Sequence, residues 1–338
     1  MGEVWTLAEY RHEKLSTVSF ELLNRGKSLS QKLNVPLASV ILGSNIKKED
    51  VQELIERGAD KVYVVDDKNF KNFLVEPYAN VLMELLNEYK PDIFIAAATT
   101  TGRTLMPYVA VRIKTGLTAD CTVLEIEEGT GNLLQTRPAI GGNILATIKT
   151  PNTRPQMATV RPHSMKPSLP DRNRKGEVIY KNYDESLFKA KSKYLRFIKD
   201  ESQQVTVQDA KVIVAGGRGL GKEENFKIIG ELAELLGGAV GASRDVVDRG
   251  WITYPHQIGL SGKTVSPALY IAAGISGAVQ HIAGMQTSEN IIAVNKDPDA
   301  QIFHLANLGI VGDLNEVLPL LIKRIKEYKA KEASKNVQ

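Results

Sequence analysis

The sequence predicts an α/β protein with two domains, each built on a mostly parallel sheet flanked by helices. A chain of 338 residues is long enough for two domains of ~150 residues each. Apolar runs of strand length alternate with longer amphipathic stretches, first from residue 4 to about residue 115 and again from residue 211 onward. A polar segment rich in Lys and Pro separates the two blocks. We therefore expect domains at 1–204 and 205–338, with a polar linker at about 163–204.

In the first block, four strands each precede a helix. We expect strands at 4–10, 38–44, 61–67 and 92–100, and helices at 17–33, 48–57, 74–89 and 103–114. Strands that are apolar on both faces are typical of a parallel sheet covered by helices on both sides. Residues 121–162 are shorter β-like segments interrupted by glycines, and we expect them to extend this sheet with antiparallel strands and hairpins.

The second block repeats the strand and helix alternation. We expect strands at 211–217, 239–242, 268–273, 291–295 and 308–312, and helices at 223–236 and 315–330. Asn315 is the expected cap of the last helix, which places Pro319 in its first turn, where a missing N–H costs little.

Composition excludes several classes of function. Lys and Arg total 43 against 39 Asp and Glu, a net charge of +4, which does not indicate nucleic-acid binding. Cys121 is the single cysteine and the five histidines lack metal-ligand spacing, so we predict no disulfide within the chain and no metal site. No apolar run approaches the ~18 residues of a membrane span and the start does not resemble a signal peptide, so we expect no membrane insertion and a cytoplasmic location.

Glycines gather where strands of the second block should pass into helices. Four of them flank Arg218 in VIVAGGRGLGKEEN, but their spacing does not match the dinucleotide fingerprint, so this loop alone is as consistent with a turn as with a ligand contact. In ALYIAAGISGAVQHIAGM, a strand ends at Gly274 and a helix is expected to begin near Ser276 and Gly277. Backbone N–H groups there, beside a serine hydroxyl, suit a pyrophosphate.

Other strand ends of this block are also polar. Ser243 to Asp245, Asn295 to Pro298 and Gly312 with Asp313 each follow a predicted strand. The segment QIGLSGKTVSP resembles the end of a P-loop, but Gln257 stands where that motif requires glycine, so an ATPase site is rejected. Because the carboxyl ends of parallel strands meet at one edge, five such ends favour one extended dinucleotide.

Long motifs in both blocks resemble the electron transfer flavoprotein alpha-subunit family. The second block carries VIVAGGRGLG, VGASRDVVDRGW, QIGLSGKTVSP, LYIAAGISGAVQHIAGM, IIAVNKDPDAQIF and GIVGDL, and the first carries TTTGRTLMPYVAVRIKTGLTADCT, RPAIGGNILATI and MATVRP. The resemblance covers nearly the whole chain. It implies two Rossmann-like domains, FAD bound mainly to the second, and a heterodimer in which the first is a scaffold that clasps a beta subunit.

The resemblance also implies the residues that contact FAD. Arg244 would lie against the isoalloxazine ring, Ser261 would offer its hydroxyl to N5, and His281 would face the C2 carbonyl. Flavin reduction places negative charge near that carbonyl, where cationic or N–H donors stabilise it. The other implied contacts are Gln257 and Gly262 bordering the ring, Arg218, Ser243, Ser276 and Gln280 toward the ring edge, ribityl chain or pyrophosphate, and Asn295 and Asp313 at the adenosine half.

The function implied is that of a redox carrier subunit rather than a self-contained enzyme. Its FAD would accept electrons from a flavoprotein dehydrogenase or NADH and pass them to a quinone-linked or ferredoxin-linked partner. One alternative is an electron-bifurcating complex, in which NADH reduces a second FAD on the beta subunit. The others are a self-sufficient NAD-dependent enzyme with a related C-terminal fold and a regulatory protein that binds a nucleotide in the first domain.

Overall fold

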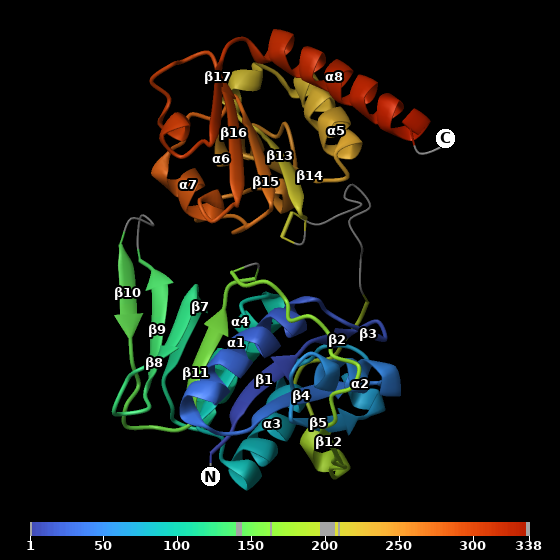
Figure 1. Cartoon of the computed structure of the whole chain (residues 1–338), viewed down its shortest axis with the longest axis vertical. Helices are drawn as coiled ribbons and strands as arrows, with labels where there is room; N and C mark the ends of the chain where they lie inside the picture. The colour runs from blue at the N-terminus through green and yellow to red at the C-terminus, as the bar shows by residue number, and fades with distance from the viewer. Residues whose placement is uncertain (1, 140–143, 163, 197–206, 209, 336–338) are drawn as a thin grey trace. The chain divides into compact units, whose positions relative to one another are not determined.

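The computed structural model describes residues 2–139, 144–162, 164–196, 207–208 and 210–335, with side chains to residue 331. The chain folds into two compact units. One contains the described residues up to 196 and the other those from 207 onward, and Figure 1 traces both. The boundary expected at 204 and 205 lies outside the described residues. No helix among those residues is long and apolar enough to cross a membrane.

A seven-stranded parallel sheet forms the centre of the first unit. Its order is β12-β5-β4-β1-β6-β11-β7, and every neighbouring pair is parallel. The strands are β1 (Val4–Ala8), β4 (Leu37–Gly43), β5 (Lys61–Asp66), β6 (Ile93–Ala97), β7 (Leu117–Cys121), β11 (Gln156–Val160) and β12 (Glu177–Tyr180). The central strands β1, β4 and β6 are buried along their whole length, as expected for strands covered on both faces.

Two pairs of helices cover this sheet (Figure 1). They are α1 (Val18–Leu33), α2 (Lys48–Glu56), α3 (Val75–Tyr89) and α4 (Thr100–Arg112), with short 3₁₀ turns η1 (Lys68–Phe70) and η2 (Glu185–Phe188). Apolar residues of α1 and α2 pack on one face of the sheet, and those of α3 and α4 pack on the other. The predicted alternation of strands and helices is confirmed.

The expected role of residues 121–162 is only partly right. β8 (Val123–Ile126), β9 (Leu133–Pro138) and β10 (Leu145–Ile148) form a separate three-stranded antiparallel sheet, whereas β11 joins the main sheet in parallel. The reason is burial: β11 is buried at every position, so it suits the sheet interior, while β10 is exposed at three of its four positions. The first strand also ends earlier than expected, and a small hairpin follows it, β2 (Tyr10–Arg11) with β3 (Lys14–Leu15).

Part of the expected linker belongs to the first unit. β12 pairs with β5, and its Val178 and Ile179 pack against the hydrophobic clusters of that unit. Arg174 Nη2 also lies 2.5 Å from Asp60 Oδ1, and Arg57 Nη1 donates to the carbonyl of Ser168. Polar composition misled the prediction because two apolar residues are enough for a short edge strand.

The second unit has a five-stranded parallel sheet in the order β14-β13-β15-β16-β17. Its strands are β13 (Val212–Gly216), β14 (Ala239–Ala242), β15 (Leu269–Ala273), β16 (Asn290–Asn295) and β17 (Leu308–Val311). Its helices are α5 (Phe226–Leu235), α6 (Arg244–Asp248), α7 (Val279–Met285) and α8 (Leu314–Lys335), with 3₁₀ turns η3 (Arg218–Leu220), η4 (Glu223–Asn225), η5 (Tyr254–His256) and η6 (Gln301–His304). One apolar cluster packs beneath α5 and α8, and the other includes Met285 of α7.

Among the helix starts that differ from the sequence prediction, those of α7 and α8 have a clear local cause. α8 begins at Leu314, because the carboxylate of Asp313 accepts a hydrogen bond from the Asn315 N–H at 2.8 Å and so caps the helix in place of Asn315. α7 begins at Val279, three residues later than expected, because Gly277 has φ +86° and a side chain there would collide with the backbone of Ile302.

A buried carboxylate joins two strands of the first unit. Glu3 is 8% exposed and accepts hydrogen bonds from Trp5 Nε1 at 2.7 Å, Lys61 Nζ at 2.8 Å and the Tyr63 hydroxyl at 3.0 Å. The hydrogen bond from Lys61 to this carboxylate raises the pKa of Lys61. Three donors from β1 and β5 therefore depend on one acidic side chain.

We predict that Glu3→Ala lowers the free energy of unfolding of the first unit by about 2–4 kcal/mol, because it leaves buried donors without an acceptor. Urea unfolding followed by Trp5 fluorescence in a Trp251→Phe background measures this. Glu128→Ala, which removes an exposed carboxylate of the same unit, is the control. Equal stability of the two variants would contradict the role given to Glu3.

Candidate functional site

A cavity of about 710 Å³ lies at the carboxyl ends of the strands in the second unit. This volume is in the usual range of ligand pockets. Eight of the twelve residues predicted from the sequence line it: Arg218, Ser243, Arg244, Ser261, Ser276, Gln280, His281 and Asn295. The structure therefore brings together residues that are up to 77 positions apart, from 218 to 295.

The sheet topology explains the place of this cavity. The chain passes from β13 to β14 on one side and then returns to β15 on the other side of β13. In open α/β sheets such a reversal leaves a crevice at the carboxyl ends of the two diverging strands. The segments after β13 and β15, which carry Gly219 and Gly274, line the cavity at this position.

Gly219 and Gly274 bring these two segments into backbone contact. The Gly219 N–H donates to the Gly274 carbonyl at 2.9 Å, and a Cβ on Gly219 would lie only 2.7 Å from the Gly274 Cα. Gly274 also has φ +63°, a backbone conformation that residues other than glycine rarely adopt. Glycine at both strand ends is visible in the sequence, but neither residue was predicted to be a ligand contact.

Gln257 and Gly262 support the cavity without lining it. Gln257 is buried, and its Nε2 donates to Ser261 Oγ at 3.0 Å. A Cβ on Gly262 would lie 2.4 Å from the Gln257 carbonyl, so only glycine lets this loop close over Gln257. Together they hold Ser261, which does line the cavity.

Gly277 and Asp313 also lie outside the cavity lining. A Cβ on Gly277 would lie 2.3 Å from the backbone nitrogen of Ile302, so this glycine allows close packing against η6. Asp313 caps α8 and lies 2.7 Å from Lys296 Nζ. The Lys296 hydrogen bond holds the pKa of Asp313 below its usual range. Ligand contacts by these two residues stay predictions.

Sequence reasoning missed several other lining residues. Besides the two glycines, they are Asp245, Gly259, Leu260, Ile275, Ala278 and Asp297. All of them lie within motifs already quoted, and all but Gly259 and Leu260 lie near a strand end, so position relative to a strand end was the main available signal. Leu260 is 59% exposed, and an apolar side chain at the mouth of a cavity offers a contact for a flat ring.

The charged groups of the cavity are exposed and paired weakly. The Arg218 side chain is 74% exposed and lies 3.7 Å from Asp245, and Arg244 is 68% exposed and lies 3.1 Å from Asp248. Exposed ion pairs of this kind contribute ~1 kcal/mol or less. Each guanidinium can therefore exchange its carboxylate partner for a ligand anion at small cost.

His281 differs from the arginines because it is buried. It is 6% exposed, and its Nε2 lies 2.9 Å from the Tyr270 hydroxyl. Burial lowers the pKa of His281 to about 4, so the imidazole is neutral at pH 7. Nδ1 has no hydrogen bond of normal geometry, although the backbone of Ile258 lies beside it. The sequence allowed a cation or an N–H donor here, and the buried site favours the neutral donor.

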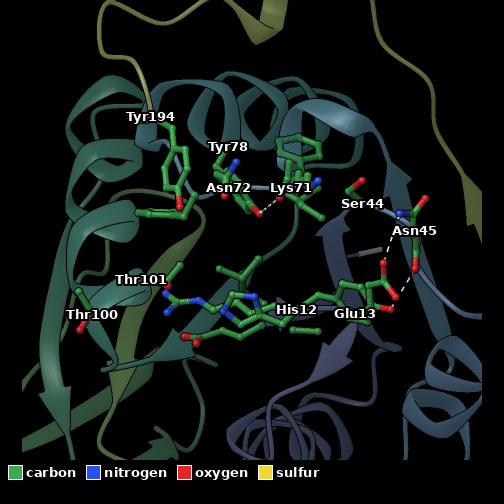
Figure 2. A pocket seen from close by; sticks show the side chains of 18 residues that line it. His12, Glu13, Ser44, Asn45, Lys71, Asn72, Tyr78, Thr100, Thr101 and Tyr194 are labelled. Carbon is green, nitrogen blue, oxygen red and sulfur yellow. Dashed lines mark hydrogen bonds between the residues drawn. The ribbon is translucent and has the colours of Figure 1, made fainter. Parts of the chain in front are cut away.

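The first unit has its own cavity of about 630 Å³, beside the ends of β1 and β4 and the start of α4 (Figure 2). Thr99 caps α4 by accepting a hydrogen bond from Gly102 N–H at 3.2 Å. The buried carboxylate of Glu9 accepts a hydrogen bond from the Thr99 hydroxyl. A carboxylate already at the positive end of this helix disfavours a phosphate there.

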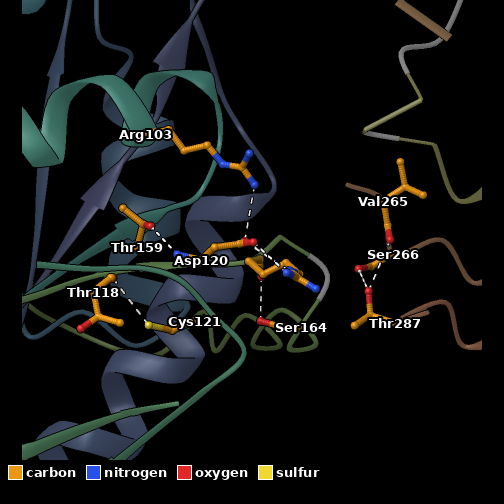
Figure 3. Close-up of polar contacts among 10 residues, drawn as sticks. Arg103, Thr118, Asp120, Cys121, Thr159, Ser164, Val265, Ser266 and Thr287 are labelled. Carbon is orange, nitrogen blue, oxygen red and sulfur yellow. Dashed lines mark hydrogen bonds and ion pairs between the residues drawn. The ribbon is translucent and has the colours of Figure 1, made fainter. Parts of the chain in front are cut away.

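Asp120, Arg103 and Arg161 form a cluster of ion pairs in the first unit (Figure 3). Asp120, at φ +62°, accepts hydrogen bonds from Arg161 at 3.2 and 2.7 Å and from Arg103 at 3.4 Å. Although burial opposes it, Arg161 lowers the pKa of Asp120. Burial raises the pKa of the neighbouring Cys121 thiol to about 12, which leaves it protonated and unreactive. The ion pairs of Asp120 link β7 to α4 through Arg103 and to the end of β11 through Arg161.

Within the described residues there is no group of three or more side chains that could bind a metal ion.

Comparisons with known proteins match two family models over most of the chain. The family model described as "Electron transfer flavoprotein domain" matches residues 4–186, and "Electron transfer flavoprotein FAD-binding domain" matches residues 206–286. The chain is 50% identical to an electron transfer flavoprotein subunit alpha of Thermoanaerobacterium thermosaccharolyticum, over 97% of this chain and 98% of that protein.

Two other relatives are similar over most of the chain. The electron transfer flavoprotein subunit alpha of Megasphaera elsdenii is 48% identical over 96% of this chain and 97% of its own length. Subunit LctC of the lactate dehydrogenase (NAD(+),ferredoxin) of Acetobacterium woodii is 44% identical over 93% of this chain and 74% of its own length. The chain therefore belongs to the electron transfer flavoprotein family, as an alpha subunit that carries the FAD-binding domain.

Proposed function

We propose that the cavity of the second unit holds FAD and that this chain, paired with a beta subunit, carries electrons from a flavoprotein dehydrogenase to a second redox partner. The main support is that hydroxyl, guanidinium and imidazole donors from separate strand ends converge on one cavity of about 710 Å³. FAD, when bound, supplies the redox chemistry, while the protein supplies binding, orientation and the surrounding potential.

The donor set fits a dinucleotide with an acidic middle and a polar flavin edge. Gly219 and Gly274 line the cavity without side chains, so a ligand can approach the backbone there. Arg218 and Arg244 are exposed enough to turn from their aspartate partners toward an anion. His281 Nδ1 is a buried polar atom without a hydrogen bond of normal geometry in the part of the chain that the structure describes, and a ligand acceptor would provide one.

Ser261 is prepared to donate its hydroxyl proton. Gln257 Nε2 donates to Ser261 Oγ, so the oxygen already has a donor and its own hydrogen is free for another acceptor. This supports the predicted contact between Ser261 and flavin N5. Arg244 stabilises negative charge that develops on the flavin during reduction, because a cation close to that charge lowers its free energy.

The three-stranded antiparallel sheet of the first unit, β8 to β10, supports contact with the beta subunit. Among the described residues β10 pairs with β9 alone, and Ile144, Leu145 and Ile148 on or beside it are 65%, 63% and 40% exposed. Exposed apolar edge strands are usually covered by another chain. We propose that the first unit acts as the scaffold and that this sheet is part of the beta-subunit contact.

An electron-bifurcating complex is the second candidate function. The supporting observation is the relative whose name includes both NAD(+) and ferredoxin, with which this chain shares 44% identity. In that case NADH reduces a second FAD on the beta subunit, which lies outside the residues of this chain.

We predict that the purified heterodimer shows the two visible absorption bands of oxidised flavin and that they follow this chain when subunits are separated under mild conditions. A self-sufficient NAD-dependent enzyme would instead be colourless and turn over alone. Absence of both bands after reconstitution with FAD would refute the proposed site.

We predict that Arg244→Ala weakens FAD binding about tenfold or lowers the flavin potential by ~60 mV for a one-electron couple, because one charged hydrogen bond is lost. Equilibrium dialysis and spectroelectrochemistry measure the two quantities, with far-UV circular dichroism as a check of folding. Arg249→Ala is the matched control, since Arg249 pairs with Asp245 but does not line the cavity. Wild-type values for both quantities in Arg244→Ala would remove Arg244 from the site.

We predict that NADH distinguishes the two candidate functions. Anaerobic titration of the heterodimer, followed by stopped-flow absorbance, should give fast flavin reduction only in a bifurcating complex. A simple carrier should stay oxidised with NADH and become reduced when its flavoprotein dehydrogenase and that enzyme's substrate are added.

A further inference from the structure

Tyr270 is not one of the residues that line the cavity, but its hydroxyl contacts His281, which does line it. Its side chain is fully buried, and it is the second residue of β15. The Tyr270 hydroxyl lies 2.9 Å from His281 Nε2, which is the hydrogen bond formed by this hydroxyl within the described part of the chain. The two rings are 6.2 Å apart and inclined by 59°, so they meet through polar atoms and are not stacked.

The hydrogen bond between these side chains can be formed in two ways. Tyr270 can donate its O–H to an unprotonated Nε2, or a protonated Nε2 can donate to the phenol oxygen. Burial raises the pKa of Tyr270, so the phenol keeps its proton in either case. In the second arrangement this buried O–H would have no acceptor among the described residues, which costs free energy. The first arrangement satisfies the phenol proton and is therefore favoured.

The favoured arrangement determines what the other ring nitrogen does. A neutral imidazole carries one hydrogen, so an unprotonated Nε2 requires the hydrogen to be on Nδ1. Nδ1 is the atom of His281 that is buried without a normal hydrogen bond. His281 lines the cavity, so a ligand that brings an acceptor atom would satisfy this N–H.

We propose that Tyr270 is a positioning residue for FAD: its hydroxyl fixes His281 in the tautomer with hydrogen on Nδ1 and so provides a neutral N–H donor to the flavin. This inference rests on the proposed binding of FAD in the cavity. It assigns a role to a residue that neither lines the cavity nor carries charge. The donor acts through a fixed dipole, and a pre-oriented dipole in a buried site stabilises charge without reorganisation.

The first test is the tautomer itself. In the heterodimer labelled with ¹⁵N-histidine, NMR distinguishes protonated from unprotonated ring nitrogens, and a His281→Ala spectrum assigns the His281 signals. We expect Nδ1 to be protonated in the wild type and a mixture of both tautomers in Tyr270→Phe. Tyr78→Phe, which removes a buried hydroxyl that donates to the Phe70 carbonyl at 3.1 Å, is the control and should leave His281 unchanged. Protonation at Nε2 in the wild type, or an unchanged tautomer in Tyr270→Phe, would overturn the proposal.

The second test measures the effect on the flavin. We expect Tyr270→Phe to weaken FAD binding about fivefold, as for the loss of one neutral hydrogen bond, and this effect should vanish in a His281→Ala background. Such a double-mutant cycle isolates the coupling between the two side chains. Full additivity of the two substitutions would mean that Tyr270 does not act through His281. Absence of flavin from the wild-type heterodimer would instead contradict the proposed function, while the His281 tautomer in that sample still decides the role of Tyr270.

Discussion

The backbone contact between Gly219 and Gly274 is the constraint on which the site of the second unit depends. It brings the segments after β13 and β15 together where the chain order reverses. Gly217 tightens the same contact, since a Cβ there would lie 2.4 Å from the Gly274 carbonyl. Larger side chains at these positions would separate the two segments. Because Arg218 lies within this loop and Ser276 follows Gly274, the backbone contact also sets the distance between their side chains.

The polar groups around the cavity fall into two kinds with different physical roles. Arg218 and Arg244 are exposed and paired with carboxylates that solvent also reaches, so their free energy changes little when they exchange partners. His281 is buried and neutral, and its orientation is limited by Tyr270. Exposed cations suit the capture of an anionic ligand, whereas a fixed buried dipole suits the tuning of a bound ring.

Much of the fold follows from patterns that a single sequence contains. Strands such as β4 and β6 are apolar on both faces, and this property alone indicates a parallel sheet between helices. The antiparallel strands β8 to β10 were expected, but as an extension of the main sheet. The edge strand β12 was not recognised, because a short strand in polar surroundings has little periodic signal. Pairing of β12 with β5 joins residues more than a hundred positions apart, which local patterns do not encode.

The site was predictable to the extent that strand ends mark it. Arg244 and Asn295 could be placed because Arg244 lies two residues after β14 and Asn295 is the last residue of β16, and parallel strands bring such residues to one edge. The contact of Gln257 with the flavin stays a prediction, whereas its hydrogen bond to Ser261 depends on loop geometry that the sequence does not encode. Tyr270 was hidden for the opposite reason: within the apolar strand LYIAA an aromatic residue is typical of the core. A buried tyrosine must still satisfy its hydroxyl, and the partner of that hydroxyl links this core position to the chemistry of the cavity.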